Sequence, residues 1–191
     1  CKLFCKRFTN STTCSSNPNF FLIFRHKLVI SYYMTNYMTK NKYLSLLLIL
    51  LITFIASGIG GFTTASFKEP WYSEIILPSF NPPSWVFAPV WTTLYFMMAL
   101  AIWKTWIKYF DLKILKIYFI HLFFNSTWSI VFFGFHQIGL ALINLVIILT
   151  FIILLMKNYF VRSKVSFYLM IPYFLWSSYA LILNSFIFYH N

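Results

Sequence analysis

Five long apolar segments constrain this chain more than any other feature of its sequence. They cover approximately residues 43–66, 84–106, 113–134, 138–157 and 165–189, and none contains an Asp or Glu. A helix needs about 20 residues to cross roughly 30 Å of hydrocarbon, so each segment can span a bilayer. With 60% apolar and 9% charged residues, the chain carries far too little charge for a soluble protein. The sequence therefore predicts an all-α integral membrane protein, a five-transmembrane-helix bundle that forms one domain over residues 43–191.

The region before the first segment, residues 1–42, is basic and rich in Ser, Thr and Asn. Its apolar patch at 20–33 is too short to cross a bilayer and is interrupted by Arg, His and Lys. We expect a disordered tail, with Met34 or Met38 as alternative starts of the mature protein. A targeting role stays open, because the region is basic, rich in hydroxyl groups and free of acids.

The Lys and Arg residues predict an orientation. Fourteen of the 15 lie before the first segment, around the second connection or around the fourth, and only Lys68 lies on the opposite side. Because basic loops stay on the inner side of a membrane, we expect the N-terminus inside and the C-terminus outside. The basic residues are scattered between apolar runs and do not form the basic face that nucleic-acid binding needs. No nucleic-acid partner is therefore expected.

The connection between the first two segments differs chemically from the rest of the chain. Residues 71–91 hold three of the seven tryptophans and four of the seven prolines, and Pro70 comes just before them. Two of the three acidic residues, Glu69 and Glu74, also lie here. Asn81 is expected to cap the second helix, since Asn is a favoured capping residue and prolines are tolerated in the first turn. A stiff, aromatic-rich segment between membrane helices indicates the lid and first wall of a binding site.

The polar residues inside the predicted spans are neutral. His121, Asn125 and Trp128 share one helix face, because they follow i, i+4, i+7 spacing. Similar stripes occur in the second and fifth segments, formed by Trp91, Tyr95 and Met98 and by Pro172, Trp176, Ala180 and, further along, Leu183 and Asn184. Three such stripes predict a mostly apolar small-molecule pocket with a few hydrogen-bonding groups. Each residue taken alone is explained as well by contacts between helices.

Several kinds of chemistry lack the residues they need. No predicted span contains an Asp or Glu. The spans therefore lack the residues that carboxylate proton relays, paired-carboxylate hydrolysis and carboxylate-bridged metal sites require. The three cysteines all precede the first segment and form no Cys-x-x-Cys pair, so no metal site is indicated. No catalytic residue is assigned, and whether the protein is an enzyme stays open.

Four motifs occur in order along the chain. They are PSFNPPSWVFAPVWTTLY at 78–95, NSTWS followed by FFG at 125–134, QIGLAL at 137–142, and PYFLW followed by Ala180 and Leu-Asn at 172–184. Together they resemble the TspO/MBR family, whose members are also called tryptophan-rich sensory proteins, translocator proteins and peripheral-type benzodiazepine receptors. The resemblance begins at about residue 44 and leaves only the N-terminal tail uncovered.

The resemblance implies a bundle, usually a homodimer, that binds porphyrins or haem and isoquinoline or benzodiazepine compounds, with sterols in animal members. It implies no obligatory cofactor. Tyr72 and Asn125 would donate hydrogen bonds to the ligand. In two departures from the family pattern, Leu77 replaces a basic residue, and no basic residue follows Lys164 where the sterol motif needs one. The residues implied to line the ligand cavity are Tyr72, Trp91, Asn125, Trp128, Trp176 and Ala180, and those at its mouth are Pro82, Pro83 and Trp85.

We therefore expect an integral membrane sensory or regulatory protein that binds tetrapyrroles. Two alternatives stay open. One is light- and oxygen-dependent porphyrin degradation, with Trp91 and Trp176 as redox-active side chains, and the other is transport of porphyrin or sterol. The sequence does not decide the physiological ligand or the oligomeric state. The composition favours a bacterial inner membrane, with a eukaryotic organelle membrane as the alternative.

Overall fold

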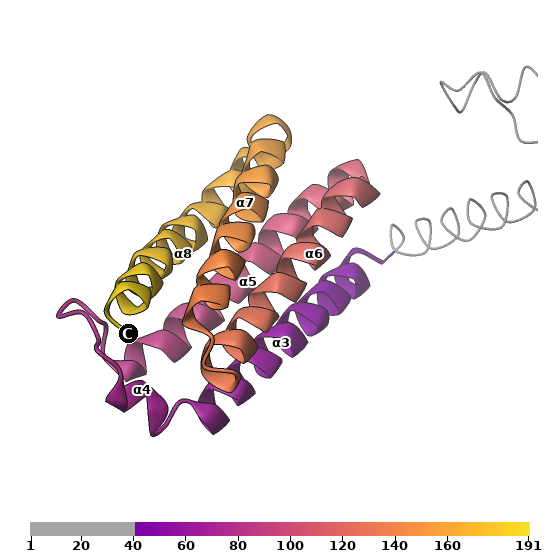
Figure 1. The fold of residues 1–191 in the computed structure, drawn as a ribbon. Coiled ribbons are helices and arrows are strands. Elements are labelled where there is room, and N and C mark those ends of the chain that lie inside the picture. Colours follow the sequence, from indigo (N-terminus) through magenta and orange to yellow (C-terminus); the bar gives the residue numbers. More distant parts are fainter. Residues whose placement is uncertain (1–40) are drawn as a thin grey trace, which may run out of the picture. The chain divides into compact units, whose positions relative to one another are not determined.

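The computed structural model describes residues 41–191, and these form a bundle of helices (Figure 1). No strand occurs in this range, and the predicted all-α fold is confirmed. The expected tail lies almost wholly outside the described residues. The elements are α3 (Lys42–Phe67), the short α4 (Trp71–Glu74), α5 (Ser84–Tyr109), α6 (Leu112–Ser129), the π-helical η1 (Ile130–Gly134) that continues α6, α7 (Ile138–Arg162) and α8 (Lys164–His190).

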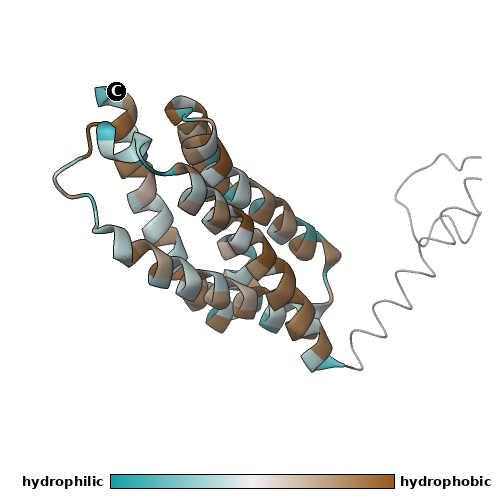
Figure 2. Ribbon diagram, turned by 90° about the horizontal axis from the view of Figure 1, so that it is seen from below, coloured by the Kyte–Doolittle hydropathy of each residue, from teal (hydrophilic) through white to brown (hydrophobic). Residues whose placement is uncertain are grey.

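Five of these helices, with η1 counted as the end of α6, are long and apolar enough to cross a membrane. The predicted spans are therefore confirmed. Helices α5 and α7 run a few residues past the expected limits, to Tyr109 and Arg162. Hydropathy marks where the apolar run ends, but the helix continues through basic residues whose long side chains can reach toward water. Figure 2 shows polar residues gathered mostly at the helix ends and connections, with apolar residues along the helices.

The five long helices form a closed ring. Helix α3 packs against α5 and α6, α5 packs against α8, and α7 joins α8 to α6. The short α4 and the C-terminal end of α8 lie at the same end of the bundle (Figure 1), where Asn191 Oδ1 accepts a hydrogen bond from the Ile76 backbone N–H at 2.9 Å. The interior of this ring differs between its two ends in how far side chains fill it.

At the end remote from α4, which we call the packed half, large side chains fill the interior. Met98, Tyr118 and Tyr159 are completely buried, and Trp106 is almost so. The Tyr118 hydroxyl lies 2.7 Å from Thr53 Oγ1, which joins α6 to α3. Interiors packed this densely leave no room for a guest molecule.

The start of α5 corrects one sequence-based expectation. Asn81 does not cap the helix, which begins at Ser84 with Pro83 in the capping position. A residue that precedes proline is disfavoured in the α conformation, and both Asn81 and Pro82 precede a proline. The helix therefore starts after the second proline, and the Asn81 side chain accepts a hydrogen bond from Tyr72 instead, at 3.2 Å.

Candidate ligand cavity

A cavity of about 480 Å³ occupies the half of the ring nearest α4, which we call the cavity half. This volume lies within the usual range of small-molecule sites. Its wall is built mainly from α3, α5, α6 with η1, and α8, with Tyr72 of α4 at one end. All six residues implied to line a ligand site lie on this wall: Tyr72, Trp91, Asn125, Trp128, Trp176 and Ala180. Their role in binding stays a prediction.

The three residues expected at the mouth do not line the cavity, and their role at the mouth stays a prediction. Pro82, Pro83 and Trp85 are not among the residues that line the cavity, and Trp85 is 75% exposed. Ser84, just before Trp85, and Phe87, two residues after it, do line the wall. Because helical residues three and four apart share a face, the stripe of α5 that faces the cavity includes 84, 87, 88 and 91. Position 85 lies outside that stripe.

Aromatic contacts hold the two central indoles in place. The Trp91 ring lies 5.8 Å from Tyr95 and 6.3 Å from Tyr173, measured between ring centroids. The Trp176 ring meets Phe87 edge-on at 6.0 Å. Such aromatic pairs add to the stability gained from burial alone. The cavity therefore keeps fixed aromatic surfaces on two different helices, α5 and α8.

A chain of hydrogen bonds forms the floor of the cavity and separates it from the packed half. The Tyr95 hydroxyl donates to Asn125 Oδ1, and Asn125 Nδ2 donates to the Tyr173 hydroxyl at 2.7 Å. The Tyr173 hydroxyl also lies within hydrogen-bonding distance of His121 Nε2, at 2.7 Å. We call Tyr95, Asn125, Tyr173 and His121 the floor network. The floor network uses the Asn125 oxygen and one of its two side-chain N–H groups. The other N–H group is therefore left for a ligand.

Three other side chains on the wall, Asn184, Trp128 and Ser177, have buried polar atoms without a hydrogen-bond partner. Asn184 is 2% exposed, and neither its Oδ1 nor its Nδ2 makes a hydrogen bond; Trp128 Nε1 is also buried without one. Leaving a buried polar group unpaired costs about 1–3 kcal/mol. Groups of this kind on a cavity wall are suited to bonding with whatever fills the cavity. The sequence carried a signal for Asn184 in its Leu-Asn motif, but Asn184 was not among the predicted site residues.

The segment 70–83 forms a lid that is tied to α8. The Tyr179 hydroxyl donates to the Phe80 carbonyl at 2.6 Å, and Asn191 bonds both the N–H and the carbonyl of Ile76, at 2.9 and 3.2 Å. Within the lid, burial raises the pKa of the Tyr72 hydroxyl, and the hydrogen bond to Asn81 opposes this only in part. Tyr72 is therefore a neutral hydrogen-bonding group at physiological pH.

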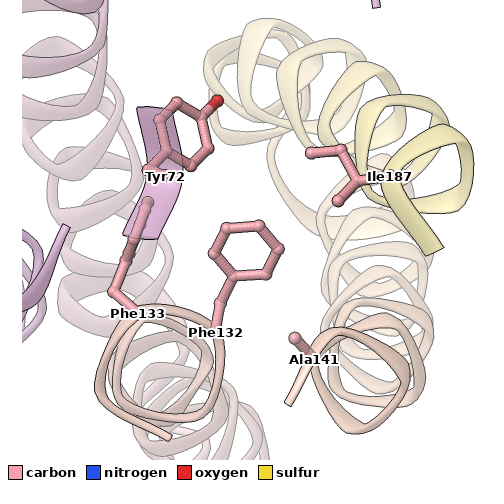
Figure 3. Packing of buried hydrophobic residues seen from close by; sticks show 5 residues of the cluster. All are labelled: Tyr72, Phe132, Phe133, Ala141 and Ile187. Carbon is pink, nitrogen blue, oxygen red and sulfur yellow. The ribbon is translucent and has the colours of Figure 1, made fainter. Parts of the chain in front are cut away.

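An apolar cluster seats the lid on the bundle. Figure 3 shows Tyr72 of α4, Phe132 and Phe133 of η1, and Ala141 and Ile187 of α7 and α8 around one point. Two adjacent residues of a regular helix point about 100° apart, yet Phe132 and Phe133 are 2% and 8% exposed and both belong to this cluster. Leu77, which replaces a basic residue of the family pattern, packs against the same cluster.

One cation lies on the wall. Among the described residues that line the cavity, Lys68 is the only basic one. Its Nζ lies 2.8 Å from Ser84 Oγ and 3.3 Å from Glu69 Oε1. The cavity therefore combines an apolar interior with a single cation at the end next to the lid.

Known proteins resemble this chain over nearly all of the described region. Residues 47–190 match the TspO/MBR family. The Tryptophan-rich protein TspO of Archaeoglobus fulgidus is 34% identical over 137 residues, covering 70% of this chain and 89% of that protein. The protein of the same name from Chlorobaculum tepidum is 34% identical over 149 residues, covering 75% and 94%. The human Translocator protein is 30% identical over 139 residues, covering 68% and 82%. The chain is a multi-pass integral membrane protein that belongs to the TspO/MBR family.

Proposed function

We propose that this protein binds tetrapyrroles within the membrane and acts as a sensory or regulatory protein. The observation that carries the proposal is that Trp91 and Trp176 both line one cavity of about 480 Å³. A flat aromatic macrocycle gains most from large aromatic surfaces that are already held in place. The names of two relatives support a role of this kind, since they read Tryptophan-rich sensory protein, from Cereibacter sphaeroides, and Translocator protein.

The polar groups of the wall suit the edges of such a ligand. The unpartnered amide of Asn184 offers a donor and an acceptor, and Trp128 Nε1 offers a further donor. Lys68 supplies positive charge beside the lid, where it could pair with a ligand carboxylate. A porphyrin with carboxylate side chains carries both an apolar face and groups that need such partners.

Haem is expected to bind through its ring and not through its iron. The described residues that line the cavity include no His, Cys or Met, which are common axial ligands of haem iron. Tyrosine can also ligate haem iron, but the hydroxyls of Tyr72, Tyr95 and Tyr179 on the wall are hydrogen-bonded to Asn81, Asn125 and Phe80. His121 is committed to the floor network and does not line the cavity. Among the described residues, no group of three metal-ligating side chains forms a metal site. Metal-free protoporphyrin and haem should therefore bind with similar affinity.

The direct test is a titration of the purified protein with protoporphyrin, followed by tryptophan fluorescence. Trp91→Ala and Trp176→Ala should each weaken binding about tenfold, which corresponds to the roughly 1.4 kcal/mol expected from losing an aromatic contact. Trp85→Ala is the matched control, since Trp85 lies in the same helix but off the cavity wall. Equal affinities for the three variants and the unaltered protein would overturn the proposal.

The role of Lys68 can be tested separately. Lys68→Met should weaken binding of protoporphyrin several-fold and leave binding of its uncharged dimethyl ester unchanged, because only the free acid can pair with the ammonium group. Lys104→Met removes a basic residue that does not line the cavity and serves as the control. Equal losses for acid and ester would show that Lys68 contributes packing and not charge.

Degradation of the bound porphyrin is a second candidate function. Trp91 contacts both Tyr95 and Tyr173, so three oxidisable side chains lie next to one another in space, with Trp91 in the middle. Illuminating the protoporphyrin complex in air should bleach the porphyrin spectrum faster than in Trp91→Phe if this chemistry occurs. Equal bleaching rates would leave binding as the function.

A further inference from the structure

The wall of the cavity is exposed on one side only. Among the described residues that line it, those on α6, η1, α7 and α8 are all buried or half-buried. The exposed ones lie on α3, on the connection that follows it, or on α5. They are Gly61, Ala65, Glu69, Ser84, Ala88 and Thr92. The cavity therefore opens between α3 and α5.

Most of this opening lies within membrane-spanning helices. Gly61 and Ala65 belong to the first candidate span, and Ala88 and Thr92 to the second. Those within the spans have small side chains, and a methyl group added at Gly61 would meet no other atom within 4 Å. Large apolar side chains cover the lipid-facing surface of α3 elsewhere, with Phe62 72% exposed next to Gly61. The small side chains thus form a gap in an otherwise bulky apolar surface.

We propose that the ligand enters the cavity sideways from the lipid, through the gap between α3 and α5, and that Gly61, Ala65 and Ala88 keep this passage open. This inference rests on the proposed function. A flat apolar ligand concentrates in the bilayer, so a passage that borders lipid meets more ligand than one that faces water. The other approach, from the aqueous side, lies beneath the lid, which hydrogen bonds from Tyr179 and Asn191 tie to α8.

The chain offers a matched pair of positions for the test. Gly58 and Gly61 lie one turn apart on α3, both are exposed, and neither has a neighbour within 4 Å of an added methyl group. Only Gly61 lines the cavity. Gly61→Phe should therefore obstruct the passage, whereas Gly58→Phe adds the same bulk to the same helix without touching it.

The measurement is the association rate of protoporphyrin with the full chain in lipid nanodiscs, by stopped-flow tryptophan quenching. Gly61→Phe should slow association at least tenfold, and Gly58→Phe should stay within twofold of the unaltered protein. Ala88→Leu, on the opposite side of the gap, should also slow association. Asn191→Ala releases one tie of the lid without touching the cavity wall, and it should leave the rate unchanged.

The outcomes separate this inference from the proposed function. If the unaltered protein does not bind protoporphyrin, the proposed function fails and the passage fails with it. If it binds but Gly61→Phe and Gly58→Phe associate at the same rate, only the passage is overturned. Faster association of Asn191→Ala would likewise show that the ligand enters beneath the lid. Should Gly61→Phe not fold, the same comparison is made between Ala88→Leu and Gly58→Phe.

Discussion

The two halves of the bundle are built from similarly apolar helices, yet one is filled and the other is hollow. In the packed half, the large side chains of Met98, Tyr118 and Tyr159 have no exposed surface. In the cavity half, the wall on α3 and α5 includes the small residues Gly61 and Ala88. The comparison teaches that side-chain volume, and not hydrophobicity, decides which end of a membrane bundle can hold a guest.

The halves also differ in how their polar groups are paired. At the packed end, Arg162 Nη1 lies 2.6 Å from Asp111 Oδ2, and the Tyr109 hydroxyl donates to the Arg162 carbonyl at 2.7 Å. In the cavity half, Asn184 has no partner for either end of its amide. The contrast is one of degree, because Trp106 Nε1 and the Tyr159 hydroxyl in the packed half are unpaired as well. Paired groups fix the connection between helices, whereas unpaired groups on a cavity wall can still form a hydrogen bond.

The largest effect is expected where the two halves meet. Asn125→Leu removes the central amide of the floor network and leaves the buried hydroxyls of Tyr95 and Tyr173 without that partner. At about 1–3 kcal/mol for each buried group left unpaired, the free energy of unfolding should fall by roughly 2–4 kcal/mol. Denaturation in detergent micelles measures this, with Ser185→Ala on the exposed face of α8 as control. A loss no greater than that of the control would mean that the network does not couple the helices.

A change of opposite sign is expected at Asn184. Asn184→Leu replaces an unpaired buried amide with an apolar side chain of similar size, so the free energy of unfolding should rise by about 1–2 kcal/mol. Protoporphyrin affinity should fall about five- to tenfold, since the ligand loses a hydrogen-bonding partner. Thermal denaturation and a ligand titration of the same preparation check both signs. A variant that is less stable and binds normally would show that Asn184 supports the fold and not the site.

The packed end should depend on pH through Asp111. Its hydrogen bond from Arg162 comes first among the causes that hold its pKa below the ordinary value, and the Lys113 backbone N–H adds to this. Because this pKa is lowered by folding, the stabilisation is complete above about pH 4 and is lost as pH falls further.

Asp111→Asn should therefore cost up to about 1 kcal/mol at neutral pH, because it removes the partly exposed ion pair with Arg162 and keeps a side chain that can cap the helix. The cost should shrink in acid. Glu74→Gln, which removes an exposed carboxylate at the other end of the bundle, is the control and should have no such profile. The measurement is the unfolding midpoint as a function of pH, and a cost that does not change down to pH 3 would contradict the assignment.

The smallest effect is expected at the lid. Tyr72→Phe removes the hydrogen bond to Asn81 and should lower the free energy of unfolding by less than about 1 kcal/mol. Since burial raises the pKa of Tyr72, its stabilisation is complete below about pH 10 and is lost at higher pH. The variant should therefore show a weaker loss of stability in strong alkali than the unaltered protein, as followed by denaturant titrations at pH 8 and pH 11.

Much of the architecture could be predicted from the sequence, because a bilayer leaves few choices to an apolar chain. The five spans follow from segment length, and the i, i+4, i+7 face of α6 does place His121, Asn125 and Trp128 on its inner side. The motifs indicated the family resemblance, and the match of residues 47–190 to the TspO/MBR family confirms it. What helical spacing cannot supply is the partner of each side chain on another helix.

The remaining features depend on such partners or on local backbone geometry. His121 shares a face with Trp128, but its hydrogen bond to Tyr173 places it beneath the cavity floor. Trp85 is different, because helix spacing alone could have placed it off the cavity-facing stripe: the predicted segment begins at residue 84, as α5 does. The gap between α3 and α5 becomes visible only once both helices are placed.

The π-helical turn at Ile130–Gly134 has a consequence for spacing along the chain. Its wider loop, closed by a hydrogen bond from the Phe135 N–H to the Ile130 carbonyl at 2.9 Å, holds one residue more than an α-turn would. Because the wider turn takes up that residue, the chain that follows keeps nearly the direction it would have after an ordinary α-turn of one residue fewer. If the same residues were wound as an ordinary α-helix, everything after them would be rotated by about 100°. The π-helical turn therefore sets the angle at which α7 joins the ring.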